Sequence, residues 1–214
     1  MEANRVPREA DVAPAADPTE GRGAGWSPAD PGPLGLTSFA TTTFILSMIN
    51  SNLVGAGATN VMLGMALAVG GIAQFTAGVW EFRTGNTFGA TAFCSFGAFW
   101  ISYYILLHVG VKDIPPSEVG SAVGLYLWAW GIFTAWMFIA SLRTTGAVAL
   151  VFLLLAITFI VLGIGNSGAS SGTIKLGGWI GLATAIAAWY AAFAGVISAT
   201  FGRSVLPVFP LSGR

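Results

Sequence analysis

Charged side chains are scarce in this sequence of 214 residues. They make up 8% of the chain, whereas an average soluble domain is about 25% charged. Residues 1–30 hold nine of the eighteen, so nine remain for the other 184 residues. A soluble fold of that size needs more polar surface than this, and 55% of the residues are hydrophobic. The composition therefore indicates a membrane protein.

Cysteine and histidine are almost absent. The one cysteine, Cys94, excludes an internal disulfide and a cysteine metal cluster, and the lone His108 adds no second ligand. No acid, base and nucleophile converge, since Glu81, Asp113 and Glu118 lie in or beside expected loops. Runs of basic residues are missing as well, which argues against nucleic-acid binding. We expect no enzyme activity, no cofactor and no metal.

A cleavable signal peptide is also missing, because the first 30 residues contain no apolar run. They carry six acidic residues, three basic residues and four prolines, a composition typical of disorder. We expect a disordered cytoplasmic tail over 1–29, a membrane domain over 30–208 and a short C-terminal tail over 209–214.

Apolar stretches dominate the rest of the chain, and six are long enough to cross a bilayer as helices, which takes about 20 residues. Short breaks rich in glycine, polar and charged residues separate them. Breaks this short make neighbouring spans antiparallel. The sequence predicts an all-α membrane protein with six transmembrane helices, at approximately 34–53, 60–82, 87–109, 119–141, 146–165 and 177–200.

The distribution of basic residues predicts the orientation of these spans. Six spans put both termini on one side, together with the second and fourth loops. Cytoplasmic loops carry an excess of Lys and Arg. Only Lys112 and Lys175 fall on the other side, so both termini are expected in the cytoplasm, in a multi-pass protein of the plasma membrane. The arginines on the terminal side are Arg5, Arg8, Arg22, Arg83, Arg143, Arg203 and Arg214.

Small residues recur every three or four positions along the sixth span. Such residues let helix backbones approach closely in a membrane. Packing within one bundle and contact between subunits both fit this pattern, and both stay open at this point. The small residues are Gly181, Ala185, Ala188, Ala192 and Gly195.

Polar residues within the first and fifth spans indicate a pathway, because such groups usually face the bundle interior or water. At about 100° per residue, one face of the first span carries Phe39, Thr43, Leu46 and Asn50. In the fifth span, Leu155 and Asn166 repeat the spacing of 11 residues. Each helix would carry an apolar residue near mid-membrane and an asparagine about 16 Å further out, at about 1.5 Å per residue.

The second and third spans extend this pattern. Asn86 and Thr87 are suited to cap the first turn of the third span, and Gln74 lies on the second span two turns before Glu81. The result is a candidate pathway with amide and hydroxyl groups near its mouths. Between them lies a collar, by which we mean Phe39, Phe96 and Leu155. The same spacings also suit ordinary core packing and backbone hydrogen bonding.

The segment at the start of the first span resembles a known signature. DPGPLGL is similar to the Asn-Pro-Ala-Pro-Leu-Gly-Leu motif of the acetate uptake transporter family, the six-span permeases of bacteria and their fungal relatives. The likeness continues through GGIAQFTAGVWEFRTGNTFGATAFCSFGAFW, LYLWAWGIFT, GGWIGL and FGRSVLP. The motif, expected at the cytoplasmic mouth, consists of Asp30, Pro31, Gly32, Pro33, Leu34, Gly35 and Leu36.

The resemblance implies a channel or transporter for acetate and other short monocarboxylates, with succinate as a further candidate. Because such acids are almost entirely ionised at pH 7 and the expected path has no fixed cation, we expect flux linked to the proton gradient. The resemblance also implies a homo-hexamer whose protomers each contain a path narrowed by a Phe, a Tyr and a Leu. Alignment of the motifs puts these on Phe39, Phe96 and Leu155, so Phe96 lacks the hydroxyl of the family tyrosine. Asp30 replaces the signature's Asn, and its carboxylate would repel anions unless it is held as a helix cap.

Two alternatives to a carboxylate transporter stay open. A path lined by apolar and amide groups would also suit small neutral solutes such as ammonia, urea or amides. The chain would also fit a non-transporting subunit of a membrane complex, because a bundle of six apolar helices can serve assembly alone.

Overall fold

The structure is a computed structural model that describes residues 26 and 28–211. Six of its helical segments are long and apolar enough to cross a membrane, and in the described part of the chain the only β pairing is one bridge between Thr145 and Pro210. The all-α, six-span prediction is confirmed. Most of the predicted tail over 1–29 lies outside the described residues. The labelled helices are α1 (Gly32–Asn50), α2 (Thr59–Met65), α3 (Gln74–Thr84), α4 (Thr87–His108), α5 (Val119–Ser141), α6 (Gly146–Ser167) and α7 (Ser171–Phe201).

The second span departs from the single regular helix that the sequence predicted. It runs from Ala56 to Thr84 and consists of a 3-10 turn, α2, a π-helical segment over Ala66–Ala73, and α3. A π-helix is wider than an α-helix and turns the following residues to a new direction, and it is frequent at functional sites. Gln74 is the first residue after this segment.

The last span begins earlier than the sequence predicted, at Ser171 instead of 177, so residues 171–176 are helical and not part of a loop. The Ser170 hydroxyl accepts a hydrogen bond from the backbone N–H of Thr173 at 3.4 Å, which caps the first turn. Ala169 before it has a φ of 48°, in the left-handed region that reverses the chain after α6. A break of three residues therefore suffices between the last two spans.

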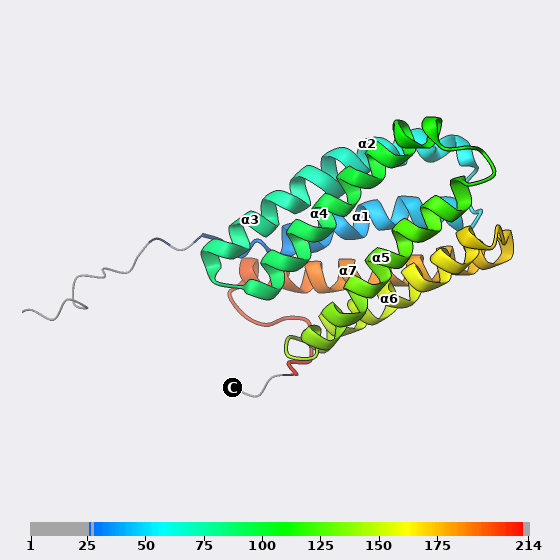
Figure 1. The fold of residues 1–214 in the computed structure, drawn as a ribbon. Coiled ribbons are helices and arrows are strands. Elements are labelled where there is room, and N and C mark those ends of the chain that lie inside the picture. The colour runs from blue at the N-terminus through cyan, green and yellow to red at the C-terminus, as the bar shows by residue number, and fades with distance from the viewer. Residues whose placement is uncertain (1–25, 27, 212–214) are drawn as a thin grey trace, which may run out of the picture.

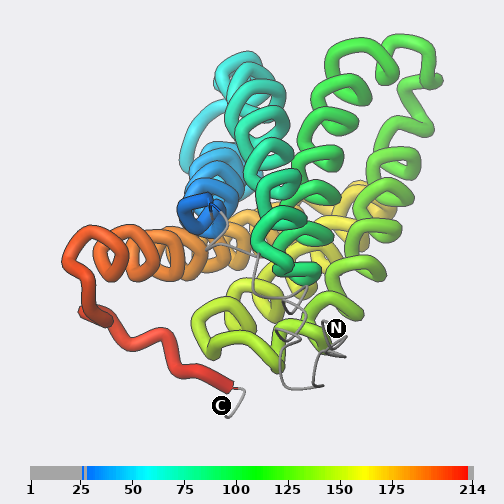
Figure 2. Tube along the Cα trace, turned by 90° about the vertical axis from the view of Figure 1, so that its left-hand side faces the viewer, coloured from blue at the N-terminus to red at the C-terminus, as the bar shows by residue number. Residues whose placement is uncertain are grey.

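The helices form one bundle and are tilted against one another, with α2, α3 and α4 on one side of the molecule and α6 and α7 on the other (Figure 1). The closest partners are α1 with α7, α5 with α6, α6 with α7, and α3 with α4. Seen from the side of the N-terminal segment, α1 lies directly against α7 (Figure 2). The start of α1 and the C-terminal segment lie at the same end of the bundle (Figure 1).

The small residues of the last span are used for packing inside the protomer. Four of the five, all but Gly195, are buried within the single chain. A Cβ on Gly178 or Gly181 would meet Ser51 or Ser47 of the α1 end, and one on Gly195 would lie 2.9 Å from Pro33 Cγ. These small residues therefore bring α7 against α1. Of the two interpretations that the sequence left open, the structure supports packing within one bundle.

The C-terminal segment is tied to the start of α6. The Gly146 N–H donates to the Phe209 carbonyl at 2.7 Å, and the Leu211 N–H donates to the Thr144 carbonyl at 3.0 Å. The Tyr190 hydroxyl on α7 donates to the Pro207 carbonyl at 2.7 Å. The first N–H groups of a helix have no partner within it, so these bonds satisfy donors that would otherwise face an apolar surrounding. The boundary at 208 stays a prediction.

Close contact between α3 and α4 gives the first testable prediction. A methyl group on Gly97 of α4 would lie 2.8 Å from the Phe75 Cα of α3, where the backbone cannot yield. Overpacking of this kind costs about 1–3 kcal/mol. Gly97→Ala should therefore lower the Tm of the detergent-purified protein by several degrees in a thermal unfolding scan.

The matched control is Gly64→Ala on α2, because no heavy atom lies within 4 Å of the position of that methyl group. The control should unfold at or above the wild-type temperature, since alanine stabilises a helix interior relative to glycine. Equal Tm values for Gly97→Ala and the wild type would mean that the two helices do not approach as described.

Candidate functional site

The three predicted collar residues come together in the middle of the bundle. Phe39 of α1, Phe96 of α4 and Leu155 of α6 are all at least 96% buried, and the Phe39 and Phe96 ring centroids lie 5.8 Å apart. They line one small cavity of about 20 Å³, the collar cavity. Its other lining residues are Leu36, Gln74, Ala92, Phe93, Val151 and Phe152. A cavity of this size holds about one water molecule.

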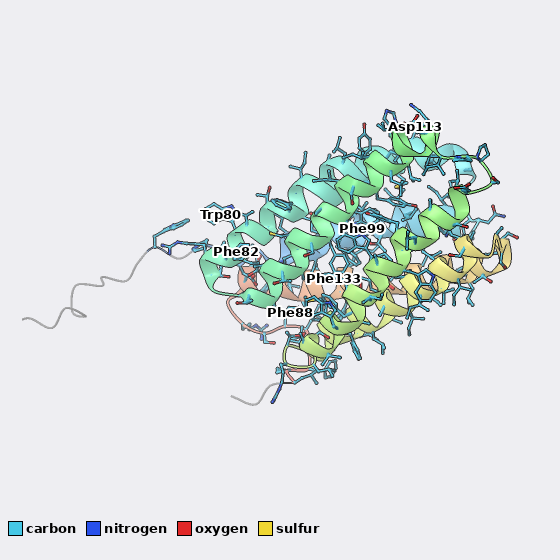
Figure 3. The ribbon with its side chains drawn as sticks, viewed as in Figure 1. Trp80, Phe82, Phe88, Phe99, Asp113 and Phe133 are labelled. Atoms are coloured by element: carbon cyan, nitrogen blue, oxygen red, sulfur yellow. The ribbon has the colours of Figure 1, made fainter. Side chains whose placement is uncertain are left out.

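Phe96 is surrounded by aromatic rings. Its ring centroid lies 5.4 Å from that of Phe133, 5.9 Å from that of Trp130 and 6.1 Å from that of Phe152. Figure 3 shows Phe133 and Phe99 inside the bundle, where α4 and α5 lie side by side. Tilted and edge-to-face ring pairs of this kind are favourable beyond the area that they bury. The collar therefore rests on a packed aromatic cluster.

A larger cavity of about 300 Å³, the Asp30 cavity, lies toward the start of α1. It shares Leu36, Ala92, Phe93 and Phe152 with the collar cavity, so the two adjoin. Figure 3 shows Phe88 toward this end of the bundle. Its polar lining is formed by Asp30, Glu81, Asn86, Thr144 and Thr145.

The N-terminal motif builds one wall of the Asp30 cavity. The Asp30 side chain accepts a hydrogen bond from the backbone N–H of Gly32 at 2.8 Å, so its carboxylate is engaged at the start of α1 as a cap would be. A Cβ on Gly35 would lie 2.7 Å from the Phe93 ring, so only glycine permits this contact. The motif thus divides: Asp30, Gly32 and Leu36 line the cavity, while Leu34 is half exposed on the outside.

Glu81, which the sequence analysis placed in or beside a loop, belongs to this candidate site. Its side chain is 98% buried, lines the Asp30 cavity, and accepts a hydrogen bond from the Thr84 hydroxyl at 3.0 Å. A Cβ on Gly32 would lie 3.0 Å from an Asp30 oxygen and 3.6 Å from a Glu81 oxygen, and one on Gly89 would lie 2.7 Å from Glu81. Two glycines on α1 and α4 therefore make room for this carboxyl group. Its position two turns after Gln74 was the available signal.

Asn86 caps α4 as predicted, because its side-chain oxygen accepts a hydrogen bond from the Gly89 N–H at 3.0 Å. It also lines the Asp30 cavity. Thr87 is the first residue of α4, is exposed, and lines none of the three cavities described here. The structure therefore brings one of these two predicted residues into the site and leaves the other outside it.

At the opposite end of the bundle a third cavity, of about 400 Å³, contains Asn50 and Lys175. Asn166 does not line it, and its side-chain nitrogen donates instead to the Leu162 carbonyl of its own helix at 2.8 Å. Thr43, in the middle part of α1, is buried, and its hydroxyl group has no hydrogen-bond partner. Of the two asparagines predicted at this mouth, one reaches a cavity.

Gln74 lies at the start of α3 and in the wall of the collar cavity. The residue is 99% buried, lines the collar cavity, and its Oε1 atom has no hydrogen-bond partner. The wider π-helical segment before it brings Gly70 and Gly71 close to Trp100 and Ile101 of α4.

In the described part of the chain no three His, Cys, Asp or Glu side chains gather as metal ligands would.

Comparison with known proteins identifies relatives over most of the chain. It is 41% identical over 189 residues to the ammonia transport outward protein 2 of Saccharomyces cerevisiae, and 41% identical over 201 residues to the acetate permease A of Emericella nidulans. These matches cover 86% of this chain but 66% and 67% of the fungal proteins. The chain thus spans about two thirds of the length of these relatives.

A bacterial relative matches over nearly its whole length. The succinate-acetate/proton symporter SatP of Escherichia coli is 40% identical over 184 residues, which cover 84% of this chain and 95% of that protein. The solved structure of the bacterial acetate channel SatP superposes with a TM-score of 0.79, at 38% identity, over 85% of this chain and 99% of that one.

Six spanning helices and these transporter relatives make the chain a multi-pass integral protein of the plasma membrane. The resemblance read from the sequence motifs is confirmed, because the sequence pattern of the GPR1/FUN34/yaaH family matches residues 16–213. The chain belongs to the GPR1/FUN34/yaaH family, the acetate uptake transporters.

Proposed function

We propose that this protein is a membrane channel or transporter for acetate and other short monocarboxylates, including succinate as a further substrate, with flux linked to protons. The observation that carries the proposal is the collar cavity, which is small, apolar and adjoined by a larger cavity with polar walls. The names of an acetate permease and of a succinate-acetate/proton symporter among its relatives support the substrate class. These relatives also support the view that the chain is not an enzyme.

The collar residues form the main barrier on the proposed path. An ordinary carboxylic acid has a pKa of about 4 to 5, so at pH 7 more than about 99% of it is ionised. A charge is expensive in an apolar constriction, and such constrictions can block passage by excluding water. The proposed path leads from the Asp30 cavity past Gln74 and the collar toward the cavity with Asn50. Thr43, Asn86, Thr87 and Asn166 remain proposed contributors of donors along it or near its mouths.

The orientation and assembly of the protein are part of this proposal. The arginine excess on the terminal side favours both termini in the cytoplasm, which makes the Asp30 cavity the inner mouth. The homo-hexamer implied by the resemblance agrees with the large exposed apolar side chains on the outside of the bundle, which suit lipid and neighbouring protomers alike.

A second function is supported by one specific finding. A relative 41% identical to this chain is named as an ammonia transport protein. Ammonia, urea and amides are neutral, so an apolar collar opposes them less than it opposes an anion. A non-transporting role in a membrane complex is the third possibility, and transport by the purified protein alone would exclude it.

The collar can be tested by its effect on substrate size. Leu155→Ala removes three carbon atoms from the wall of a cavity of about 20 Å³. Proteoliposomes with this variant should take up longer acids such as butyrate several-fold faster than the wild type, while acetate uptake changes little. Leu150→Ala on the same helix is the matched control, because Leu150 is exposed and does not line the collar cavity. An unchanged size limit for Leu155→Ala would remove Leu155 from the path.

The two transport functions can be separated by competition and by pH. If short acids are the substrates, unlabelled propionate should reduce uptake of labelled acetate strongly and urea should not. An inward proton gradient should accelerate net uptake at constant total acetate, because it raises the protonated fraction outside and lowers it inside. Inhibition by urea as strong as by propionate, with no response to the gradient, would favour the channel for neutral solutes.

A further inference from the structure

Gln74 carries the only polar side chain in the lining of the collar cavity. The remaining lining residues are Leu36, Phe39, Ala92, Phe93, Phe96, Val151, Phe152 and Leu155. Buried polar atoms in proteins are almost always hydrogen-bonded, and an exception calls for an explanation. The Gln74 Oε1 atom is such an exception. A ligand that donates a hydrogen bond would satisfy it.

The other unpartnered buried atoms of the described residues do not lie in this cavity. They are Thr43 Oγ1 and Trp100 Nε1, and neither residue lines it. The hydroxyl groups of Thr134, Thr158 and Thr184 donate to carbonyls of their own helices, as that of Thr42 does to the Ser38 carbonyl at 3.0 Å. The Gln74 oxygen is therefore set apart from these atoms, because its residue lines the collar cavity.

The edge of a primary amide matches the edge of a protonated carboxylic acid. The amide offers an N–H donor beside a carbonyl acceptor, and the acid offers an O–H donor beside a carbonyl acceptor, so the two pair through two hydrogen bonds. The match holds for either orientation of the amide. It therefore does not depend on which of the two terminal side-chain atoms is assigned as nitrogen. A carboxylate has only acceptors, so it would leave the amide oxygen unpaired and repel it.

We propose that Gln74 selects the protonated acid over its anion at the collar. The inference rests on the proposed function and specifies the form of the substrate that passes. A carboxylate takes up one proton from water on one side, crosses as the neutral acid paired with Gln74, and releases that proton on the other side. Each acid then carries one proton, and no net charge crosses the membrane.

The charged groups around Gln74 favour the same outcome. Glu81 follows it by seven residues on α3, about 10 Å away along the helix at about 1.5 Å per residue, and Asp30 at the start of α1 lines the adjoining cavity. On α4, Cys94 lies with its thiol 3.9 Å from the Phe75 carbonyl, and α6 contains no charged or titratable residue. No Lys, Arg or His is among the described residues that line the collar cavity or the Asp30 cavity, whereas two carboxyl groups, those of Asp30 and Glu81, line the latter.

Two probes distinguish the neutral from the charged form. Acetamide presents the donor and acceptor edge of acetic acid at every pH, whereas trifluoroacetate stays ionised. In wild-type proteoliposomes, acetamide should inhibit the uptake of tracer acetate equally at pH 5.5 and at pH 7.0. Trifluoroacetate should inhibit at least about tenfold more weakly, since the acid pairs through hydrogen bonds that the anion lacks.

Substitution of Gln74 tests whether its amide is responsible. Gln74→Leu and Gln74→Met have similar bulk and neither donor nor acceptor at this position, so inhibition by acetamide should weaken about tenfold in both. The matched control is Thr42→Val, which removes a fully buried hydroxyl outside the collar cavity and should keep the wild-type inhibition. Size-exclusion chromatography in detergent verifies that each variant is folded.

The inference is overturned if trifluoroacetate inhibits the wild type as well as acetamide does, or if both Gln74 variants keep full inhibition by acetamide. The first comparison uses the wild type alone and stays decisive even if the variants misfold. Failure of the proposed function would look different, because wild-type vesicles would then take up acetate no faster than empty ones, before any probe is added.

Discussion

The structure depends on one constraint, which is that hydrocarbon offers no hydrogen-bond partner to a polar group. The hydroxyl groups of Thr42, Thr158 and Thr184 obey it by donating to carbonyls one turn earlier in their own helices. The first N–H groups of α6 obey it by donating to the C-terminal segment. The Gln74 oxygen is an exception, because it is buried without a partner and its residue lines the collar cavity on the proposed path.

Close helix packing follows from the same constraint. Lipid tails are as apolar as leucine side chains, so helices associate through contact and not through exclusion of water. Glycines at 78, 97, 178 and 181 permit backbone approach between α3 and α4 and between α1 and α7. The rigid frame that results holds Phe39, Phe96 and Leu155 around a space of about 20 Å³. A looser frame would not hold so narrow an opening.

Much of this arrangement could be predicted from the sequence, because hydropathy and helical period act locally. The six spans follow from length and composition, and the 100° period put Phe39 and Asn50 on one face. The π-helical segment could not be read, since nothing in Ala66–Ala73 distinguishes it from α-helix before α4 packs against it. The start of α7 was missed because the serines and glycines before Lys175 resemble a loop, although Ser170 caps a helix there.

The site was only partly predictable, because side-chain partners depend on neighbouring helices. The bond of Asn166 to its own helix and the burial of Glu81 beside Gly32 and Gly89 both require the assembled bundle. The surroundings of Phe96, which stands where the family resemblance implies a tyrosine, also require the assembled bundle. Phe96 lines the collar cavity and brings no hydroxyl group to it, whereas the family resemblance implies a tyrosine at this position. Gln74 is thus the one polar residue among the described residues that line the collar cavity, and the proposed selection of the protonated acid falls on its amide.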